Sequence, residues 1–379
     1  MKVLIVNPIL YTNENRNIKK VNTIKDTMIY DLCLAFKKKG CDVTLAASDL
    51  YKPSENESYP FKIIWMRTRC TKLFPPHTLP YCPEVKKIAK SGNFDLIITS
   101  EVFSLNSLKL ALCTSKNLIV WQELGKHNRI FHGLASKFWY GIVAKIGFKK
   151  ALIVARSVQA REFISKYCKN VSDTIIDHGV NIEKFTPCKE KDNQFAISSQ
   201  LISRKHIEKS IEAFAKYLNK YDDSAKLYIM GDGDEKENLR KLAKDLGADK
   251  NIIFTGKLGH NELIEILKKS IAMLVYTQSD LNMVSIVESL SLATPVITTS
   301  VPYCSSYIES ENLGIVDDNW NEDDLRRIAT SDEYINNCMN YRKYLPTEYK
   351  AEQFLKAANN LVIKNMELGE SNERIKNQI

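Results

Sequence analysis

The chain has 379 residues, of which 44% are hydrophobic and 26% charged, as in ordinary globular proteins and unlike disordered or fibrous chains. Its net charge of +9 is uneven, because residues 1–187 hold 29 Lys and Arg against 15 Asp and Glu, while the remainder holds 25 against 30. The length suits two domains, no apolar run is long enough to span a membrane, and nine cysteines without regular spacing argue against a disulfide scaffold or a zinc site.

Short apolar runs alternate with amphipathic stretches in the first half of the chain. Strands are expected at 2–7, 42–47, 61–66, 94–99, 117–121 and 151–155, and helices at 24–39, 84–90 and 105–113. Strands separated by helices are typical of a parallel sheet that is covered on both faces. Residues 1–187 are therefore predicted to form a doubly wound α/β domain.

The same alternation begins again after Pro187. Strands are expected at 194–198, 226–230, 251–255, 273–276 and 295–298, and helices at 205–218, 235–246, 262–269 and 283–292. This pattern predicts a second doubly wound domain over 188–347, with a ligand-binding cleft where the two domains meet. A helix over 348–367 is expected to follow, and then a flexible polar tail over 368–379.

Two acids bracket the helix at 283–292. Asp280 lies in the loop before it and Glu288 lies on the helix itself. The carboxyl end of a parallel strand and the amino end of the next helix meet at one place, which suits a phosphate-bearing ligand. The loop acid could accept hydrogen bonds from sugar hydroxyls, and the helix acid could hold a ribose diol. The alternative is that Asp280 caps the helix and Glu288 is a solvated surface residue.

This stretch resembles the E-x7-E region of retaining glycosyltransferases of family 4, which have the GT-B fold. Asp280 stands at the family's first Glu, Glu288 matches its second, and Ala293-Thr294-Pro295-Val296 follows as the family's turn and Pro-Val strand do. Leu281-Asn282-Met283 replaces the usual Gly-rich loop. The resemblance implies two Rossmann-like domains facing a central cleft, with the last helix crossing back to the first domain.

The resemblance also implies that the second domain holds a nucleotide-diphosphate sugar, with a UDP-sugar favoured. Arg204 and Lys205 would face the diphosphate, where a departing nucleotide needs positive charge. The family's Arg is absent, because Ser199-Gln200 stand at its position, and Arg204 would supply that charge. The other residues expected to contact the nucleotide are Glu288, Ser285, Val284, Asn282, Gly256, Lys257 and Gly231. For Gly231, which belongs to a Gly-Asp-Gly sequence, a plain tight turn is the alternative.

In the first domain, two residues could act near the reacting sugar. Many family members have a His just after the strand that corresponds to 117–121. Glu123 is the positional match here and His127 is the chemical match. Either could accept a hydrogen bond from the donor sugar or the acceptor hydroxyl, and a purely structural role is the alternative for both.

The segment 129–150 mixes aromatic residues with lysines. One interpretation is an amphipathic helix packed on the sheet. The other is a helix that faces an anionic membrane surface, with aromatic residues at the interface and lysines on the headgroups. The basic first half of the chain suits an anionic partner, while no motif indicates nucleic acid binding.

The predicted function is that of a retaining, metal-independent glycosyltransferase acting on a glycan or lipid-linked acceptor in surface-polysaccharide synthesis. Neither a bound metal nor another cofactor is expected. Such an enzyme would be cytoplasmic, or peripheral at the inner face of the plasma membrane. The alternatives are a nucleotide-sugar 2-epimerase of the same fold, and an inactive subunit that binds a nucleotide or a partner transferase.

Overall fold

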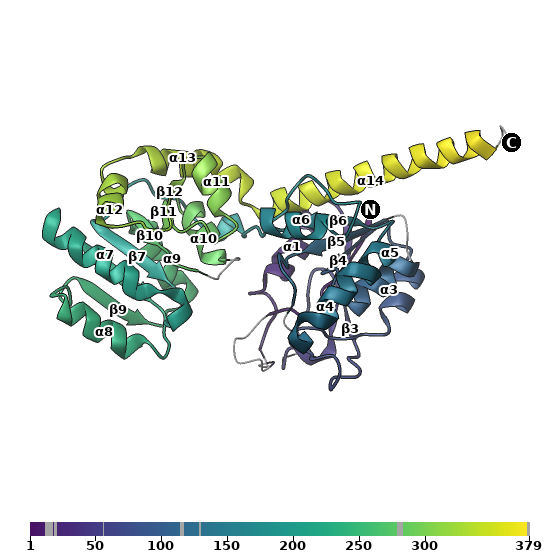
Figure 1. Ribbon diagram of the computed structural model, residues 1–379, viewed down its shortest axis with the longest axis horizontal. Helices are drawn as coiled ribbons and strands as arrows, with labels where there is room; N and C mark the ends of the chain where they lie inside the picture. Colours follow the sequence, from purple (N-terminus) through teal and green to yellow (C-terminus); the bar gives the residue numbers. More distant parts are fainter. Residues whose placement is uncertain are drawn as a thin grey trace. The chain divides into compact units, whose positions relative to one another are not determined.

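The computed structural model describes residues 1–11, 18, 21–55, 57–113, 117–128, 130–278 and 283–376 (Figure 1). The chain divides into two compact units. Unit 1 comprises Met1–Gly179 and Thr347–Ile379, and unit 2 comprises Val180–Pro346. The domain limits predicted from the sequence were 187 and 347. Residues 180–185 pack within unit 2, because Phe185 is buried and Arg342 donates hydrogen bonds to the carbonyls of Ile182 and Phe185.

Unit 1 is built on a sheet of six parallel strands in the order β3-β2-β1-β4-β5-β6. The strands are β1 (Lys2–Val6), β2 (Asp42–Ser48), β3 (Lys62–Met66), β4 (Leu96–Ser100), β5 (Leu118–Gln122) and β6 (Leu152–Ala155). The helices are α1 (Met28–Lys38), α2 (Val85–Ser91), α3 (Leu105–Cys113), α4 (Leu134–Phe138), α5 (Lys145–Gly147), α6 (Val158–Ser165) and α14 (Thr347–Lys376). A π-helical turn, η3 (Trp139–Ala144), joins α4 to α5.

Alternating side chains of the strands divide the core of unit 1 into two layers. Val3 and Ile5 pack with α1 and α14 on one face of the sheet. Leu4 and Val6 pack on the other face with α2, α3, η3 and α6. Successive side chains of a strand point to opposite faces, so runs that are apolar throughout are the signature of a sheet covered on both sides.

Unit 2 repeats this architecture with the strand order β12-β11-β10-β7-β8-β9. Its strands are β7 (Gln194–Ser198), β8 (Lys226–Met230), β9 (Ile252–Gly256), β10 (Ala272–Leu274), β11 (Val296–Thr298) and β12 (Gly314–Val316). Its helices are α7 (Ile207–Lys220), α8 (Lys236–Asp245), α9 (His260–Lys269), α10 (Val284–Ser291), α11 (Ser305–Ser310), α12 (Glu322–Ala329) and α13 (Glu333–Tyr341). Helices α7, α8 and α12 cover one face, and α9, α10, α11 and α13 cover the other.

In both sheets the chain order reverses beside the first strand. The reversal lies between β1 and β4 in unit 1, and between β7 and β10 in unit 2. In doubly wound sheets of this kind, ligands bind at the carboxyl ends of the strands that flank the reversal. Each unit therefore has one place where a ligand site is expected.

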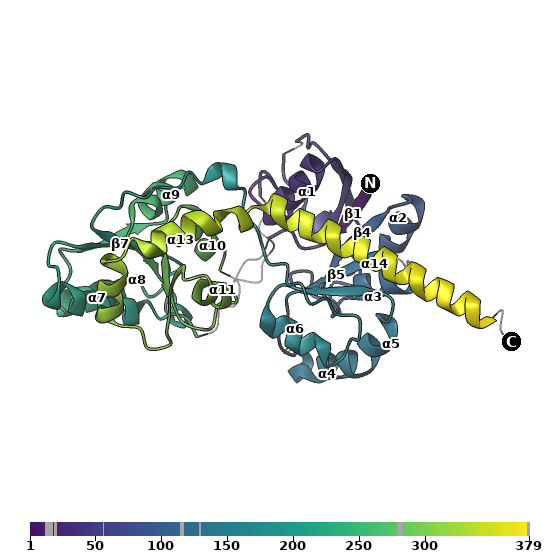
Figure 2. The same cartoon turned by 90° about the horizontal axis from the view of Figure 1, so that it is seen from above.

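The predicted return of the last helix to the first domain is confirmed. Helix α14 packs beside α1 (Figure 2). Phe354 lies against Phe36, and Lys38 and Lys39 pair with Glu348 and Glu352. The helix continues to Lys376, beyond residue 368 where the flexible tail was predicted to begin. A single Gly369 costs a helix about 1 kcal/mol, which does not end it.

Candidate functional site

A narrow hollow lies at the chain reversal of unit 2. Its walls come from the end of β7, the end of β10, the turn that precedes α7 and the residue before α10. They include Ser198, Ser199, Lys205, Tyr276, Thr277 and Met283. The hollow therefore occupies the position where a doubly wound sheet binds its ligand.

Lys205 contributes to this hollow and is half-buried, whereas its neighbour Arg204 is exposed. Both belong to a short 3-10 turn, Ser203–Lys205, and His206 follows in the left-handed conformation at φ 46°. This bend ends the loop after β7 and starts α7, so Lys205 is held at the rim of the sheet. The structure thus brings Lys205 to the start of α10, the helix that carries Glu288.

Helix α10 has no side-chain cap from its N-cap residue. Met283 occupies the N-cap position in an extended conformation, and its side chain accepts no hydrogen bond from the first turn. The backbone N–H groups of Val284 and Ser285 lie in this turn, where the helix dipole favours an anion. Asp280 and Asn282, the other residues predicted to act here, lie outside the described residues.

Glu288 lies in the second turn of α10. Its Oε1 is 3.2 Å from Nε2 of His260, the first residue of α9, and 18% of the Glu288 side chain is exposed. The ring of His260 in turn meets Phe185 edge to face, with 5.9 Å between the centroids. The carboxylate is thus oriented by a neighbouring helix, and Glu288 is not the freely solvated residue of the alternative interpretation.

The Gly-Asp-Gly turn after β8 allows two loops to pack backbone to backbone. A Cβ on Gly231, whose φ is 149°, would lie 1.8 Å from the carbonyl oxygen of Ser199, and one on Gly233 would lie 2.3 Å from that of Leu201. Hydrogen bonds from Ser199 to Met230 and from Leu201 to Asp232 fix this contact. Gly231 therefore holds the loop that leads to Lys205.

Gly256 and Lys257 lie at the end of β9. Gly256 has φ 72°, and its carbonyl accepts the N–H of Gly231 at 3.0 Å. Lys257 is exposed. Gly256 is thus joined to the turn at Gly231 by a main-chain hydrogen bond, and the role of Gly256 and Lys257 with the nucleotide base stays a prediction.

In unit 1, a charged cluster occupies the carboxyl ends of β4, β5 and β6. Arg156 donates a hydrogen bond to Glu123 at 2.7 Å, stacks over the Trp121 ring at 3.8 Å and lies 3.0 Å from Nε2 of His178. His178 is buried, and burial together with the Arg156 charge keeps its pKa well below the usual value. Glu123 is thus anchored by Arg156 at the edge of the sheet.

Glu101 was not identified from the sequence, although it directly follows β4 beside the chain reversal. It adopts the left-handed conformation at φ 64°, and its carboxylate accepts the N–H of Glu123 at 2.7 Å. Burial raises the pKa of Glu101 to about 7, with a further contribution from Glu123, while Arg156 opposes the shift. The available signal was an acid immediately after a predicted parallel strand.

His127 lies among aromatic side chains. Its Nδ1 is 3.2 Å from the Ser136 hydroxyl and its Nε2 is 3.1 Å from the Tyr167 hydroxyl. Tyr140 and Phe163 flank the ring at 5.8 and 5.2 Å. Both ring nitrogens of His127 thus have protein partners, and the Glu123 carboxylate has one in Arg156. Which of the two residues acts near the reacting sugar stays a prediction.

Over the parts of the chain that the structure describes, no three His, Cys, Asp or Glu side chains gather as a metal site. Within the same parts, no helix combines the length and apolarity needed to cross a bilayer.

Comparison with known proteins shows what unit 2 is similar to. Residues 181–337 match the family model for glycosyl transferases group 1. Across these residues the chain is similar to group 1 glycosyl transferases. A curated relative, the alpha-monoglucosyldiacylglycerol synthase of Streptococcus pneumoniae, is 26% identical over 255 residues, which are 60% of this chain and 57% of the relative. The chain therefore matches little more than half the length of that enzyme.

Solved structures extend the similarity to the fold of the whole chain. The lipopolysaccharide outer core galactosyltransferase WaaB superposes with a TM-score of 0.64 over 96% of this chain and 100% of that protein, at 14% identity. Alr3699/HepE of Anabaena, solved with UDP and glucose, gives 0.55 over 98% of this chain and 100% of that protein, at 12% identity. These similarities and the two six-stranded parallel sheets confirm the predicted GT-B fold. The cleft expected between the two sheets stays a prediction.

Proposed function

We propose that this chain is a glycosyltransferase that moves a sugar from a nucleotide-diphosphate donor, with a UDP-sugar favoured, to a hydroxyl of a glycan or lipid-linked acceptor. The observation that carries the proposal is the position of Lys205 at the hollow beside the start of α10, with Glu288 on that helix. The similarity to group 1 glycosyl transferases covers these same residues. The structural neighbour from Anabaena, which was solved with UDP and glucose, also supports such a donor.

In this proposal, unit 2 binds the donor. Glu288 accepts hydrogen bonds from the ribose, and Lys205 with the N–H groups of Val284 and Ser285 faces the diphosphate. Arg204 adds positive charge from the rim of the same loop, and Asp280 contacts the transferred sugar. Fixed donors and charges aimed at a departing phosphate stabilise the transition state, because the negative charge develops there.

The reaction we propose retains the configuration of the sugar and needs no metal. The bond between the sugar C1 and the diphosphate oxygen breaks, and the acceptor oxygen bonds to C1 on the same face. The acceptor proton passes to the leaving diphosphate, so no side-chain nucleophile is needed. Lys205 and Arg204 take the charge-neutralising role that a metal would have in another fold.

The proposed setting is surface-polysaccharide assembly in the cytoplasm or at the inner face of the membrane. The basic first half of the chain supports contact with an anionic surface. The similarity to a synthase of glucosylated diacylglycerol supports a lipid acceptor.

A donor screen followed by product analysis tests this function. Thermal denaturation is measured with UDP-, GDP-, ADP- and CMP-linked sugars, since a ligand that binds only the native state raises the melting temperature. The stabilising donor is then incubated with candidate acceptors, and the anomeric configuration of the product is read by NMR. Transfer with retention, unaffected by EDTA, is expected. Release of free sugar and nucleotide without an acceptor would instead indicate an epimerase, and no turnover of any donor would indicate a binding subunit.

A further inference from the structure

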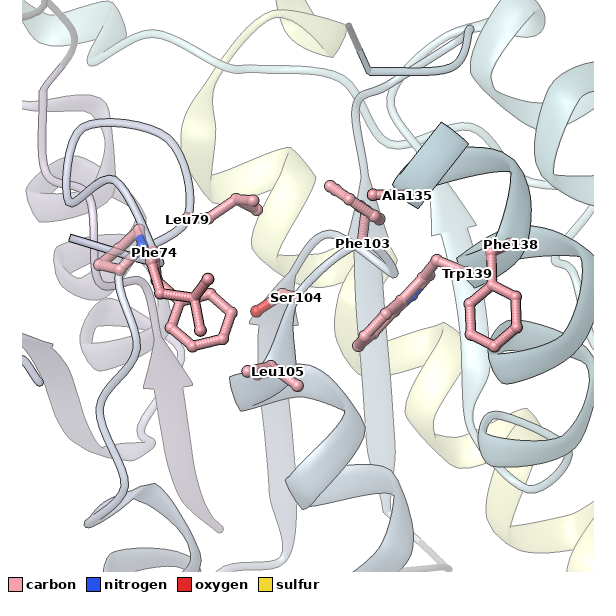
Figure 3. A pocket seen from close by; sticks show the side chains of 10 residues that line it. Phe74, Leu79, Phe103, Ser104, Leu105, Ala135, Phe138 and Trp139 are labelled. Atoms are coloured by element: carbon pink, nitrogen blue, oxygen red, sulfur yellow. The ribbon is translucent and has the colours of Figure 1, made fainter. Parts of the chain in front are cut away.

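Unit 1 contains an apolar groove of about 340 Å³ at the carboxyl edge of its sheet (Figure 3). Phe74 and Leu79, from the loop after β3, form one side, and Phe103 and Trp139 form the other, with Leu105 between them. Its volume falls within the range of about 300–1,000 Å³ that is usual for small-molecule sites. Phe103, which lines the groove, stands two residues after Glu101 in the chain.

The walls of the groove are fixed by specific contacts. The Trp139 indole N–H donates to the carbonyl of Val102 at 2.8 Å, and its ring meets Phe103 edge to face at 5.6 Å. Because the polar end of Trp139 has a partner inside the protein, its apolar ring can form the wall. The apolar walls of the groove are thus held in place by the protein itself.

Phe138 connects the groove to an exposed apolar stripe, since it lines the groove and is itself 62% exposed. The stripe consists of Leu134, Phe138, Ile142 and Ile146, all at least half exposed. Residues four apart drift by about 40° per step around an α-helix. The π-helical turn Trp139–Ala144 holds more residues per turn than an α-helix, which offsets that drift in the middle of the stripe.

Lysines accompany this stripe. Lys137, Lys145, Lys149 and Lys150 are exposed on the same segment, and the structure shows no ion pair for them among the described residues. The sequence from 124 to 161 contains no Asp or Glu. Exposed apolar side chains beside unneutralised lysines are the composition of a surface that lies on an anionic bilayer.

We propose that the α4–α5 face of unit 1 docks on an anionic lipid bilayer and that the apolar groove receives one hydrocarbon chain of a lipid from it. The charge complementarity identifies the bilayer, and the continuity of the stripe with the groove at Phe138 gives the chain a path into the protein. The lipid headgroup would then lie toward Glu101 and Glu123. This inference names the acceptor class as a lipid with an acyl or prenyl chain, and in that respect it rests on the proposed function.

The docking is tested with phosphatidylglycerol and phosphatidylcholine vesicles in a sedimentation assay that needs neither donor nor turnover. The full chain is expected to bind phosphatidylglycerol vesicles and to be released by salt. Ile142→Glu and Ile146→Glu are expected to weaken binding at least tenfold, and Lys145→Ala with Lys149→Ala about twentyfold. The matched controls in unit 2, Leu246→Glu and the pair Lys241→Ala with Lys244→Ala, are expected to leave it unchanged. Equal binding to both vesicle types, or unchanged binding in the stripe variants, would show that the α4–α5 face does not dock on an anionic bilayer.

The groove is tested separately by Trp fluorescence. Vesicles of phosphatidylglycerol with brominated chains are expected to quench the wild type, and Trp139→Phe is expected to lose most of this quenching while still sedimenting with vesicles. Quenching that persists in Trp139→Phe, or that is absent in the wild type, would show that no lipid chain enters the groove. The melting temperature of Ile146→Glu separates this outcome from failure of the proposed function. A nucleotide-sugar should still raise that temperature, because the donor site lies in unit 2.

Discussion

The imidazole Nε2 of His260 lies 3.2 Å from Oε1 of Glu288 and links the first residue of α9 to the second turn of α10. This contact fixes one oxygen of the carboxylate, and the other has no hydrogen bond within the described residues. His260 is therefore a positioning residue for the group that we assign to the ribose.

His260→Ala is expected to weaken donor binding about three- to tenfold, because a neutral or partly charged hydrogen bond contributes about 0.5–1.5 kcal/mol. His260→Gln, which can still donate to the carboxylate, is expected to recover most of the affinity. Calorimetric titration with the donor measures both, and the exposed neighbour Asn261→Ala serves as control. Equal affinity in His260→Ala and the wild type would remove the positioning role.

Lys205→Ala is expected to lower the turnover number about a hundredfold while the melting temperature changes little. Lys205 is half-buried at the hollow, and the charge that it offers would be needed most as the diphosphate departs. Lys209→Ala on α7, the helix that follows the turn, is the control, since Lys209 pairs with Glu212 on the surface. A wild-type rate in Lys205→Ala would place the leaving group elsewhere.

The fold was largely predictable from local sequence. The apolar runs at β7 and β8 are bounded by polar residues and give those strands their observed limits, and α3 was predicted at Leu105–Cys113 as found. Strand β12, only Gly314–Val316, was missed because three residues carry no detectable period. Helix α11, which precedes β12, and helices α12 and α13, which follow it, were also missed, because they are only 6, 8 and 9 residues long.

The sequence predicted only part of the site, namely the residues that belong to a recognisable local pattern. Lys205 and Glu288 were found through a known spacing. The pairing of Glu288 with His260, 28 residues away, depends on how α9 and α10 pack, which no local pattern encodes. The partners of His127, Ser136 and Tyr167, were equally invisible in the sequence, since they come from two other helical segments.

Gly231→Ala is expected to destabilise the protein by more than about 3 kcal/mol, because the added Cβ would meet the Ser199 carbonyl oxygen at 1.8 Å. Gly247→Ala is the matched control. Its φ is also positive, at 70°, but nothing lies within 4 Å of the new Cβ, so a cost of about 1 kcal/mol is expected. The midpoint of urea denaturation measures both. Equal midpoints would show that the two loops can separate at no cost.

The free energy of unfolding of Glu101→Gln is expected to depend less on pH than that of the wild type. The native pKa of about 7 exceeds the unfolded value near 4.5, so between these values the native state binds more protons than the unfolded state. The free energy of unfolding contributed by Glu101 therefore falls as pH rises through this window. Denaturation curves at pH 5 and pH 8 should show the wild type losing more stability than Glu101→Gln. Parallel losses would contradict a raised pKa.

In the proposed function, Lys205 and Glu288 bind the same nucleotide-diphosphate sugar in unit 2. Calorimetric titration of UDP and of uridine into the wild type, Lys205→Ala and Glu288→Ala tests it most directly. Glu288→Ala is expected to weaken both ligands about ten- to a hundredfold, since a hydrogen bond to a charged group contributes about 1.5–3 kcal/mol. Lys205→Ala should weaken UDP alone. Unchanged UDP affinity in both variants would show that Lys205 and Glu288 do not bind the nucleotide.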